Sequence, residues 1–232
     1  MKKIIVLAFL VAGISLHAQS KSELLTHYEN FYKEMRLQGD VVGVINALTH
    51  LNVIAPSQAR RDTLAFIYMN NGQHLQALNT IGIENDKNSS DIAVQVKAVS
   101  LKTLNQPKRA IEQFETLFER NPNAFLAYEL ADLQILVGDA EGAAKNIEYG
   151  LANVKDDMKH AFYERQQPYE ASLKAAFYHI KGLLTFNNDK TKIDESIALM
   201  EEALKIDPNF NLASLSKQAL ESKKNTPESA KE

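Results

Sequence analysis

Apolar and polar positions alternate along this chain with the period of amphipathic helices. In the stretch RAIEQFETLFERNPN, residues 109–123, Ala110 and Phe114 fall on one face of a predicted helix. Asn121-Pro122 predicts where this helix ends, because proline disfavours helical geometry in the residue before it. The value of the pattern depends on whether it recurs.

The pattern does recur, at an interval of roughly 34 residues. Small side chains stand at four matching positions, Val44, Ala77, Ala110 and Ala144. Four residues after each come Leu48, Ile81, Phe114 and Glu148, of which the last departs from the apolar pattern. A turn signal precedes each small residue, at Gly39-Asp40, Gly72, Asn105-Gln106-Pro107 and Gly138-Asp139. Each unit is therefore predicted to be a helix, a tight turn and a second helix.

These units resemble the tetratricopeptide-repeat family. With its first position at Asp91, the third unit matches the family pattern at Val94, Ala98, Leu101, Ala110, Phe114, Leu117 and Pro122, and Lys97 departs from it. The fourth unit is placed with its first position at Phe125 and lacks the closing proline. The resemblance implies an all-α fold, a right-handed αα superhelix (a tetratricopeptide-repeat solenoid) with a C-terminal capping helix.

The matches also imply a domain organisation. Repeats are expected at about residues 25–57, 58–90, 91–124, 125–153 and 174–208, within a repeat domain of residues 22–223. Residues 154–173 form an insertion between the fourth and fifth repeats, and residues 210–223 are expected to be the capping helix. The tail, residues 224–232, has little apolar content and is expected to be flexible.

The insertion carries three aromatic residues, Phe162, Tyr163 and Tyr169. One hypothesis is that they form an exposed insertion surface that contacts a partner or ligand. The other is that these rings pack on the repeats and close the joint between the fourth and fifth units. The sequence leaves both open.

The N-terminal segment, residues 1–18, is predicted to be a secretory signal peptide. Lys2 and Lys3 precede an apolar run that is too short to span a bilayer, and Ala18 offers a cleavage point before Gln19. The chain has no cysteine, which excludes a lipid anchor at the cleavage site. No integral membrane span is expected in the mature chain, and the expected location is the periplasm of a Gram-negative bacterium or the secreted fraction.

Charge and chemistry narrow the function further. Loss of Lys2 and Lys3 changes the net charge from −3 to −5, so nucleic-acid binding is not expected. No phosphate-binding loop or nucleophile motif is present, and the chain is not expected to be an enzyme or to need a cofactor. Asp156, His160 and Glu164 would share a face if the insertion were helical, but such a row is more often a solvated face, so no metal site is expected.

The family resemblance implies a concave groove lined by positions 2, 5, 9, 12 and 13 of the first helix of each repeat. The expected groove residues are Glu29, Lys33 and Arg36 in the first unit, Val99 in the third, and Glu129, Leu133, Leu136 and Val137 in the fourth. The valine and leucines are expected to be exposed there and to meet a partner. The Lys, Asn and Arg clamp with which some family members hold chaperone tails is absent.

The function expected from the sequence is therefore an exported (periplasmic) protein–protein interaction scaffold, which binds a protein or peptide segment in its concave groove. The alternative is a glycan- or small-ligand-binding envelope protein that uses the aromatic residues of segment 154–175. Exposed rings in the insertion would favour the alternative, whereas buried rings would favour the scaffold.

Overall fold

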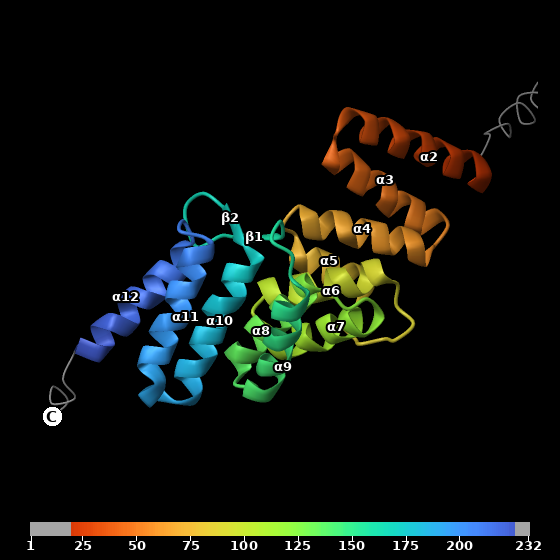
Figure 1. Ribbon diagram of the computed structural model, residues 1–232. Coiled ribbons are helices and arrows are strands. Elements are labelled where there is room, and N and C mark those ends of the chain that lie inside the picture. Colours follow the sequence, from red (N-terminus) through yellow and green to blue (C-terminus); the bar gives the residue numbers. More distant parts are fainter. Residues whose placement is uncertain (1–19, 226–232) are drawn as a thin grey trace, which may run out of the picture. The chain divides into compact units, whose positions relative to one another are not determined.

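A computed structural model describes residues 20–225 (Figure 1). The expected signal peptide lies outside these residues, as does most of the expected tail. The described part of the chain divides into two compact units, residues 20–81 and 82–225. Both units are built from helix pairs, which confirms the all-α expectation. No helix among residues 20–225 is both long and apolar enough to cross a membrane.

The first unit contains two helix pairs. Its helices are α2 (Lys21–Gln38), α3 (Val41–Ile54), α4 (Gln58–Asn70) and α5 (His74–Ile81). Ser20 and Glu23 form a capping box that satisfies backbone N–H groups at the start of α2. A small core of Val44, Leu48, Leu51 and Leu64 joins α3 to α4. Val44 and Leu48, the two positions named from the sequence in the first repeat, thus face other helices.

The second unit begins with two further pairs and continues through a hairpin to the C-terminal helices. The pairs are α6 (Asp91–Thr103) with α7 (Pro107–Arg120), and α8 (Ala124–Val137) with α9 (Ala140–Asn153). The strands β1 (Lys159–Phe162) and β2 (Tyr169–Ser172) follow. After them come α10 (Leu173–Asn188), the short 3₁₀ helix η1 (Lys190–Lys192), α11 (Ile193–Ile206) and α12 (Asn211–Asn225). Helix α12 packs on α11 at the place expected for a cap (Figure 1).

The turns inside the helix pairs set the true period of the repeat. Gly39, Gly72, Asn105 and Gly138 all have positive φ, from 55° to 80°, and they follow one another at equal intervals along the chain. Glycine and asparagine tolerate this left-handed conformation, so each can reverse the chain between two helices. The described repeats therefore share one constant interval up to α9.

This interval corrects the register expected for the fourth unit. Ala110 is fully buried, and Ala143, one interval later, is fully buried as well. Ala144 and Glu148, which were expected to take the small and apolar positions, are exposed, whereas Ile147 is buried. The expected register was one residue too late, because two adjacent alanines satisfy the sequence pattern equally well.

The loop before α6 explains the departure at Lys97. Its side chain is buried, and its Nζ donates a hydrogen bond of 2.6 Å to the backbone oxygen of Glu84. Arg120, at the end of α7, donates to the backbone oxygens of Lys87 and Ser89 and pairs with Asp91 at 2.7 Å. Two basic side chains thus satisfy carbonyl groups of a loop that has few backbone partners of its own.

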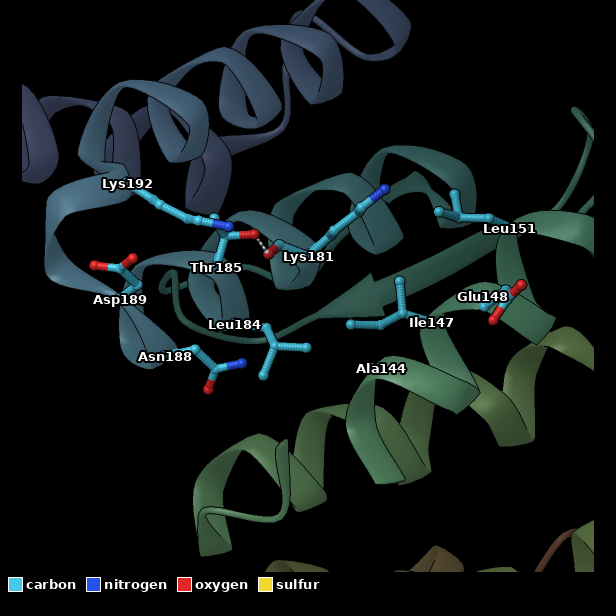
Figure 2. A pocket seen from close by; sticks show the side chains of 10 residues that line it. All are labelled: Ala144, Ile147, Glu148, Leu151, Lys181, Leu184, Thr185, Asn188, Asp189 and Lys192. Atoms are coloured by element: carbon cyan, nitrogen blue, oxygen red, sulfur yellow. Dashed lines mark hydrogen bonds between the residues drawn. The ribbon is translucent and has the colours of Figure 1, made fainter. Parts of the chain in front are cut away.

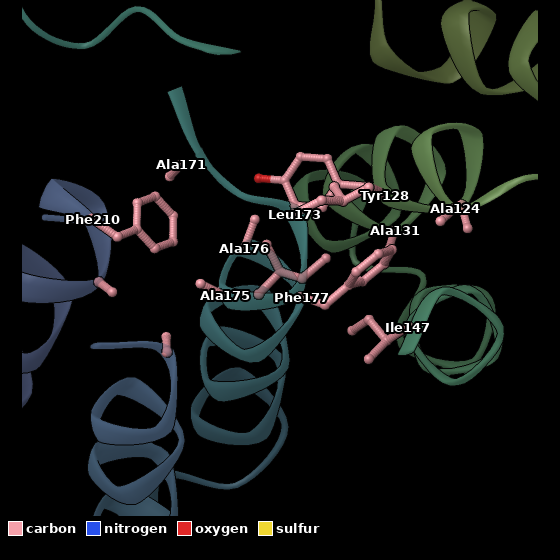
Figure 3. Close-up of a cluster of buried hydrophobic side chains, with 14 of the residues drawn as sticks. Ala124, Tyr128, Ala131, Ile147, Ala171, Leu173, Ala175, Ala176, Phe177 and Phe210 are labelled. Atoms are coloured by element: carbon pink, nitrogen blue, oxygen red, sulfur yellow. The ribbon is translucent and has the colours of Figure 1, made fainter. Parts of the chain in front are cut away.

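A core of the second unit takes its buried residues from α8, α9, the hairpin, α10, α11 and α12. Figure 3 shows Phe177 between α10 and the pair α8–α9, near Tyr128 and Ile147. Phe177 is fully buried, and a Cβ added at Gly150 would lie 2.0 Å from its Cζ. Only glycine at position 150 therefore allows α9 and α10 to approach this closely.

Candidate functional site: a groove beside the hairpin

The insertion folds as an antiparallel hairpin. Strands β1 and β2 pair His160 with Ala171 and Phe162 with Tyr169. In a strand, alternate side chains point to the same face, so His160 and Phe162 lie together. Asp156 lies before the strand and contacts Lys174, whereas Glu164 lies after it and contacts Tyr169. The row of Asp156, His160 and Glu164 proposed for a helix is therefore not formed.

Phe162 joins the hairpin to the helices. Its ring centroid lies 4.9 Å from that of Phe210, which precedes α12, and 6.3 Å from that of Tyr128 on α8. The side chain is only 7% exposed. The expectation that Phe162 belongs to an exposed insertion surface was wrong, because the strand turns this ring into the joint between the fourth and fifth units.

The other two aromatic residues of the hairpin differ from Phe162 and from each other. Tyr169 is half-buried, and its hydroxyl donates a 2.6 Å hydrogen bond to Glu164. Burial and this carboxylate raise the pKa of Tyr169 to about 12, so the phenol keeps its proton. Tyr163 is 74% exposed. Of the expected insertion surface, Tyr163 alone presents a largely free ring.

One hollow of the second unit, of about 570 Å³, lies beside the hairpin. Helix α6, helix α8 and the hairpin supply most of its lining, and α7, α10 and α12 contribute one residue each. Most of its walls are apolar or aromatic, with charged groups on α6, α8 and the hairpin tip. It is lined by Val99, Lys102, Thr103, Phe114, Tyr128, Glu129, Asp132, residues 160–164, His179 and Leu212.

A charged cluster fixes the hairpin to this hollow. Glu129 accepts a short hydrogen bond from Lys102 through one carboxylate oxygen. His160 Nε2 donates to the other oxygen at 3.1 Å. Burial alone would raise the pKa of Glu129, but the hydrogen bonds from His160 and Lys102, together with the charge of Lys102, lower it below its usual value. Glu129 is therefore ionised and holds α6, α8 and β1 together.

Two histidine nitrogens at the hollow are buried without a hydrogen-bond partner among residues 20–225, Nδ1 of His160 and Nδ1 of His179. His179 pairs instead through Nε2, 2.9 Å from the Ser216 hydroxyl. Burial lowers the pKa of His179 to about 4, so this ring is neutral near pH 7.

Across the described residues, no group of three or more potential ligands is placed to hold a metal ion.

A second hollow of about 320 Å³ is lined by residues of α6, α7 and the start of α8. The two share Val99 and Phe114 as wall residues, so they adjoin there. Phe125, at the start of α8, lines the second hollow and is 41% exposed. We call the two adjoining hollows the hairpin groove. Residues of α6, α7, α8 and the hairpin line the hairpin groove.

Another hollow of the second unit, of about 510 Å³, lies between α9 and α10. Figure 2 shows its lining side chains, which come from α9 on one side and from α10 and η1 on the other. Ile147, Leu151 and Leu184 give it apolar walls. Ala144 and Glu148 also line it, so the two residues misplaced by the expected register face this hollow rather than the core.

Known structures built from helix pairs have a similar fold, although no family model and no curated protein matches the sequence. YrrB, described as a TPR protein with an unusual peptide-binding site, gives a TM-score of 0.64 at 13% identity, over 90% of this chain and 97% of YrrB. MamA from Desulfovibrio magneticus RS-1 gives 0.60 at 12% identity, over 84% and 99%. Another MamA structure gives 0.55 at 19% identity, over 89% and 98%. The chain has the tetratricopeptide-repeat fold.

Within this tetratricopeptide-repeat fold, the corrected register changes which residues of the fourth unit reach the groove. With its first position at Ala124, positions 2, 5 and 9 become Phe125, Tyr128 and Asp132, and all three line the hairpin groove. Leu133, expected at position 9, is only 3% exposed. Helix α8 packs against α7, α9 and α10. Leu133, the residue after Asp132, therefore points into these helices and not into the groove.

The remaining expected groove residues divide by unit. In the second unit, Val99 and Glu129 line the hairpin groove. Leu136 and Val137 do not line it: Leu136 is 67% exposed elsewhere on the surface, and Val137 is half-buried. In the first unit, Glu29 lines a separate hollow of about 350 Å³. Lys33 and Arg36 are exposed, and the Arg36 guanidinium lies 5.6 Å from the centre of the Tyr32 ring.

Among the hairpin-groove residues that the sequence did not predict are Lys102, Asp132, His160 and His179. A signal for Lys102 was present, since it stands at position 12 of the third unit, one of the inward-facing positions. Asp132 was hidden by the one-residue register error. The two histidines reach the groove through the hairpin and α10, which no repeat pattern describes.

Proposed function

We propose that this protein is a protein–protein interaction scaffold that binds a partner segment in the hairpin groove. The observation that carries the proposal is that two neighbouring hollows share Val99 and Phe114 as lining residues, so together they offer a longer surface than a single pocket. Elongated grooves with apolar walls and a few polar groups suit a peptide segment. The tetratricopeptide-repeat fold of YrrB, which has a peptide-binding site, is consistent with this use.

Binding rather than catalysis is also the function that the chemistry of the groove supports. Glu129 is held by Lys102 and His160, and His179 is a neutral buried ring that pairs with Ser216. A catalytic acid or base needs a free group aimed at a reacting atom. Glu129 instead ties the hairpin to α6 and α8, and His179 joins α10 to α12. We therefore propose that the protein is not an enzyme.

The glycan-binding alternative has less support. It needs a surface of free aromatic rings, because sugars stack on exposed ring faces. Phe162 is buried in the joint, and the ring of Tyr169 is covered by the Arg165 guanidinium, whose carbon lies 4.9 Å from the ring centre. One exposed ring, that of Tyr163, is a small platform for such a ligand.

Export is part of the proposal and rests on the N-terminal sequence. Lys2 and Lys3, the apolar run and Ala18 have the order of a secretory signal. The mature protein is expected to begin near Gln19 and to be found in the periplasm or outside the cell. N-terminal sequencing of the protein from its native cells checks this, and recovery of intact Met1 in the mature protein would contradict it.

The Val99→Lys variant tests the proposed groove. It places a long cationic side chain where the two hollows meet, so partner recovery from an extract of the native cells should fall at least about tenfold. The melting temperature should change little, because Val99 is only half-buried. The matched control is Leu136→Lys, which makes the same kind of change on an exposed residue outside the groove. Equal recovery with both variants would place the binding face elsewhere.

A further inference from the structure

Asp132 is the acid of the hairpin groove that lacks a hydrogen-bond donor. Its nearest cation is Lys102, whose Nζ lies 3.9 Å from Asp132 Oδ2 and is engaged by Glu129. No donor reaches the Asp132 carboxylate within hydrogen-bond distance among residues 20–225. Its side chain is 46% exposed, so it can be reached from the groove. Burial raises the pKa of Asp132, and so does the charge of Glu129, whereas the charges of Lys102 and His160 lower it without cancelling the rise.

The charge around this carboxylate is negative overall. The larger hollow of the groove is lined by three carboxylates, those of Glu129, Asp132 and Glu164, and by one ammonium group, that of Lys102. Glu129 already has two donors, and Glu164 accepts hydrogen bonds from Tyr169 and Asn211. Asp132 is therefore the group best able to accept a new cation.

The walls beside Asp132 suit the remainder of a basic side chain. Val99, Phe114 and Leu212 are apolar and can cover an aliphatic stem. Tyr163 lines the same hollow with a largely exposed ring, which can face a guanidinium group. The hairpin already contains one such contact, because the Arg165 guanidinium lies over the ring of Tyr169.

We propose that the hairpin groove selects a protein segment that carries an arginine or lysine, with the cation paired to Asp132 and its stem against the apolar wall formed by Val99, Phe114 and Leu212. This inference rests on the proposed function and adds the chemistry of the partner to it. Charge complementarity of this kind contributes more to the choice of partner than to the strength of binding.

The probe is a positional-scanning library of synthetic peptides, in which each position is fixed in turn as Arg, Lys, Gln, Glu or Leu. Binding of the labelled full chain is compared with binding of its Asp132→Asn, Asp132→Lys and Val99→Lys variants. Glu112→Gln, an exposed acid on α7 outside the groove, is the control for loss of one negative charge. Circular dichroism checks that each variant is folded.

We expect Arg or Lys at one position to bind about tenfold tighter than Gln or Glu. Asp132→Asn should remove this preference, Asp132→Lys should turn it toward Glu, and Glu112→Gln should leave it unchanged. Binding that Val99→Lys abolishes but that shows no preference for a cation would overturn this inference and leave the proposed groove standing. Binding that survives Val99→Lys, or the failure of every peptide to bind, would contradict the proposed function itself.

Discussion

The Leu133→Glu variant is expected to lose about 4 kcal/mol or more of its free energy of unfolding. Leu133 is 3% exposed on a helix that contacts α7, α9 and α10. The change removes a buried aliphatic side chain and puts a carboxylate into a site with little water, and both effects destabilise the folded state. Urea denaturation of the purified variant measures the loss.

Leu136→Glu is the matched control for this variant. It makes the same substitution three residues later on α8, where the side chain is 67% exposed. Its free energy of unfolding should stay within about 0.5 kcal/mol of that of the unchanged protein. If the two variants were equally stable, the orientation of α8 described above would be wrong, and Leu133 could belong to the groove after all.

The second large effect is expected for Phe162→Ala. A two-stranded hairpin is marginally stable by itself, so β1 and β2 depend on the ring that packs against Phe210 and Tyr128. Removal of a buried phenylalanine ring costs about 3–5 kcal/mol in a protein core. We expect a loss of roughly 3 kcal/mol in the free energy of unfolding, together with weaker partner binding, because the hairpin forms one wall of the groove.

Tyr163→Ala separates this packing effect from the loss of an aromatic surface. The two residues are adjacent in the chain, but Tyr163 is 74% exposed. Its removal should change the free energy of unfolding by less than about 0.5 kcal/mol. Thermal denaturation of the Phe162→Ala and Tyr163→Ala variants compares their stabilities. A Phe162→Ala protein as stable as Tyr163→Ala would show that the hairpin does not depend on this joint.

The repeat itself could be predicted from the sequence because its signals are local. A residue that tolerates positive φ, such as Gly39 or Asn105, marks each turn, and a small residue such as Ala110 follows it in the next helix. A positive φ favours glycine or asparagine, and a close helix contact favours a small side chain. The residue type at each position therefore indicates the local geometry directly. The helix-pair architecture therefore followed from the spacing of a few residues.

The register of the fourth unit could not be fixed in the same way. Ala143 and Ala144 are both small, so either one matches the position of the repeat that requires a small residue at the helix contact. Helix α8, AFLAYELADLQILV, is apolar on most sides because it packs against several other helices. Its sequence consequently does not reveal which face is turned to the groove. The error moved Leu133 into the expected groove and Asp132 out of it.

The hairpin was beyond the sequence pattern for a different reason. Each strand is too short for a clear alternation of apolar and polar positions. The spacing of Asp156, His160 and Glu164 also fits a helix. What fixes the hairpin is the packing of Phe162 on Tyr128 and Phe210, which lie far from it in the sequence on either side. Such long-range contacts leave no local signal.

Photo-crosslinking from the hairpin groove tests the central claim most directly. A photoreactive phenylalanine analogue is placed at Tyr163, which lines the groove and is largely exposed, and separately at Leu215, which is 50% exposed on α12 and lines none of the hollows described above. Illumination of the folded variants in native cells, followed by mass spectrometry, identifies what each position touches. We predict that position 163 is crosslinked to a protein segment and that position 215 is not. Equal crosslinking at both positions, or crosslinking at position 215 alone, would contradict the account.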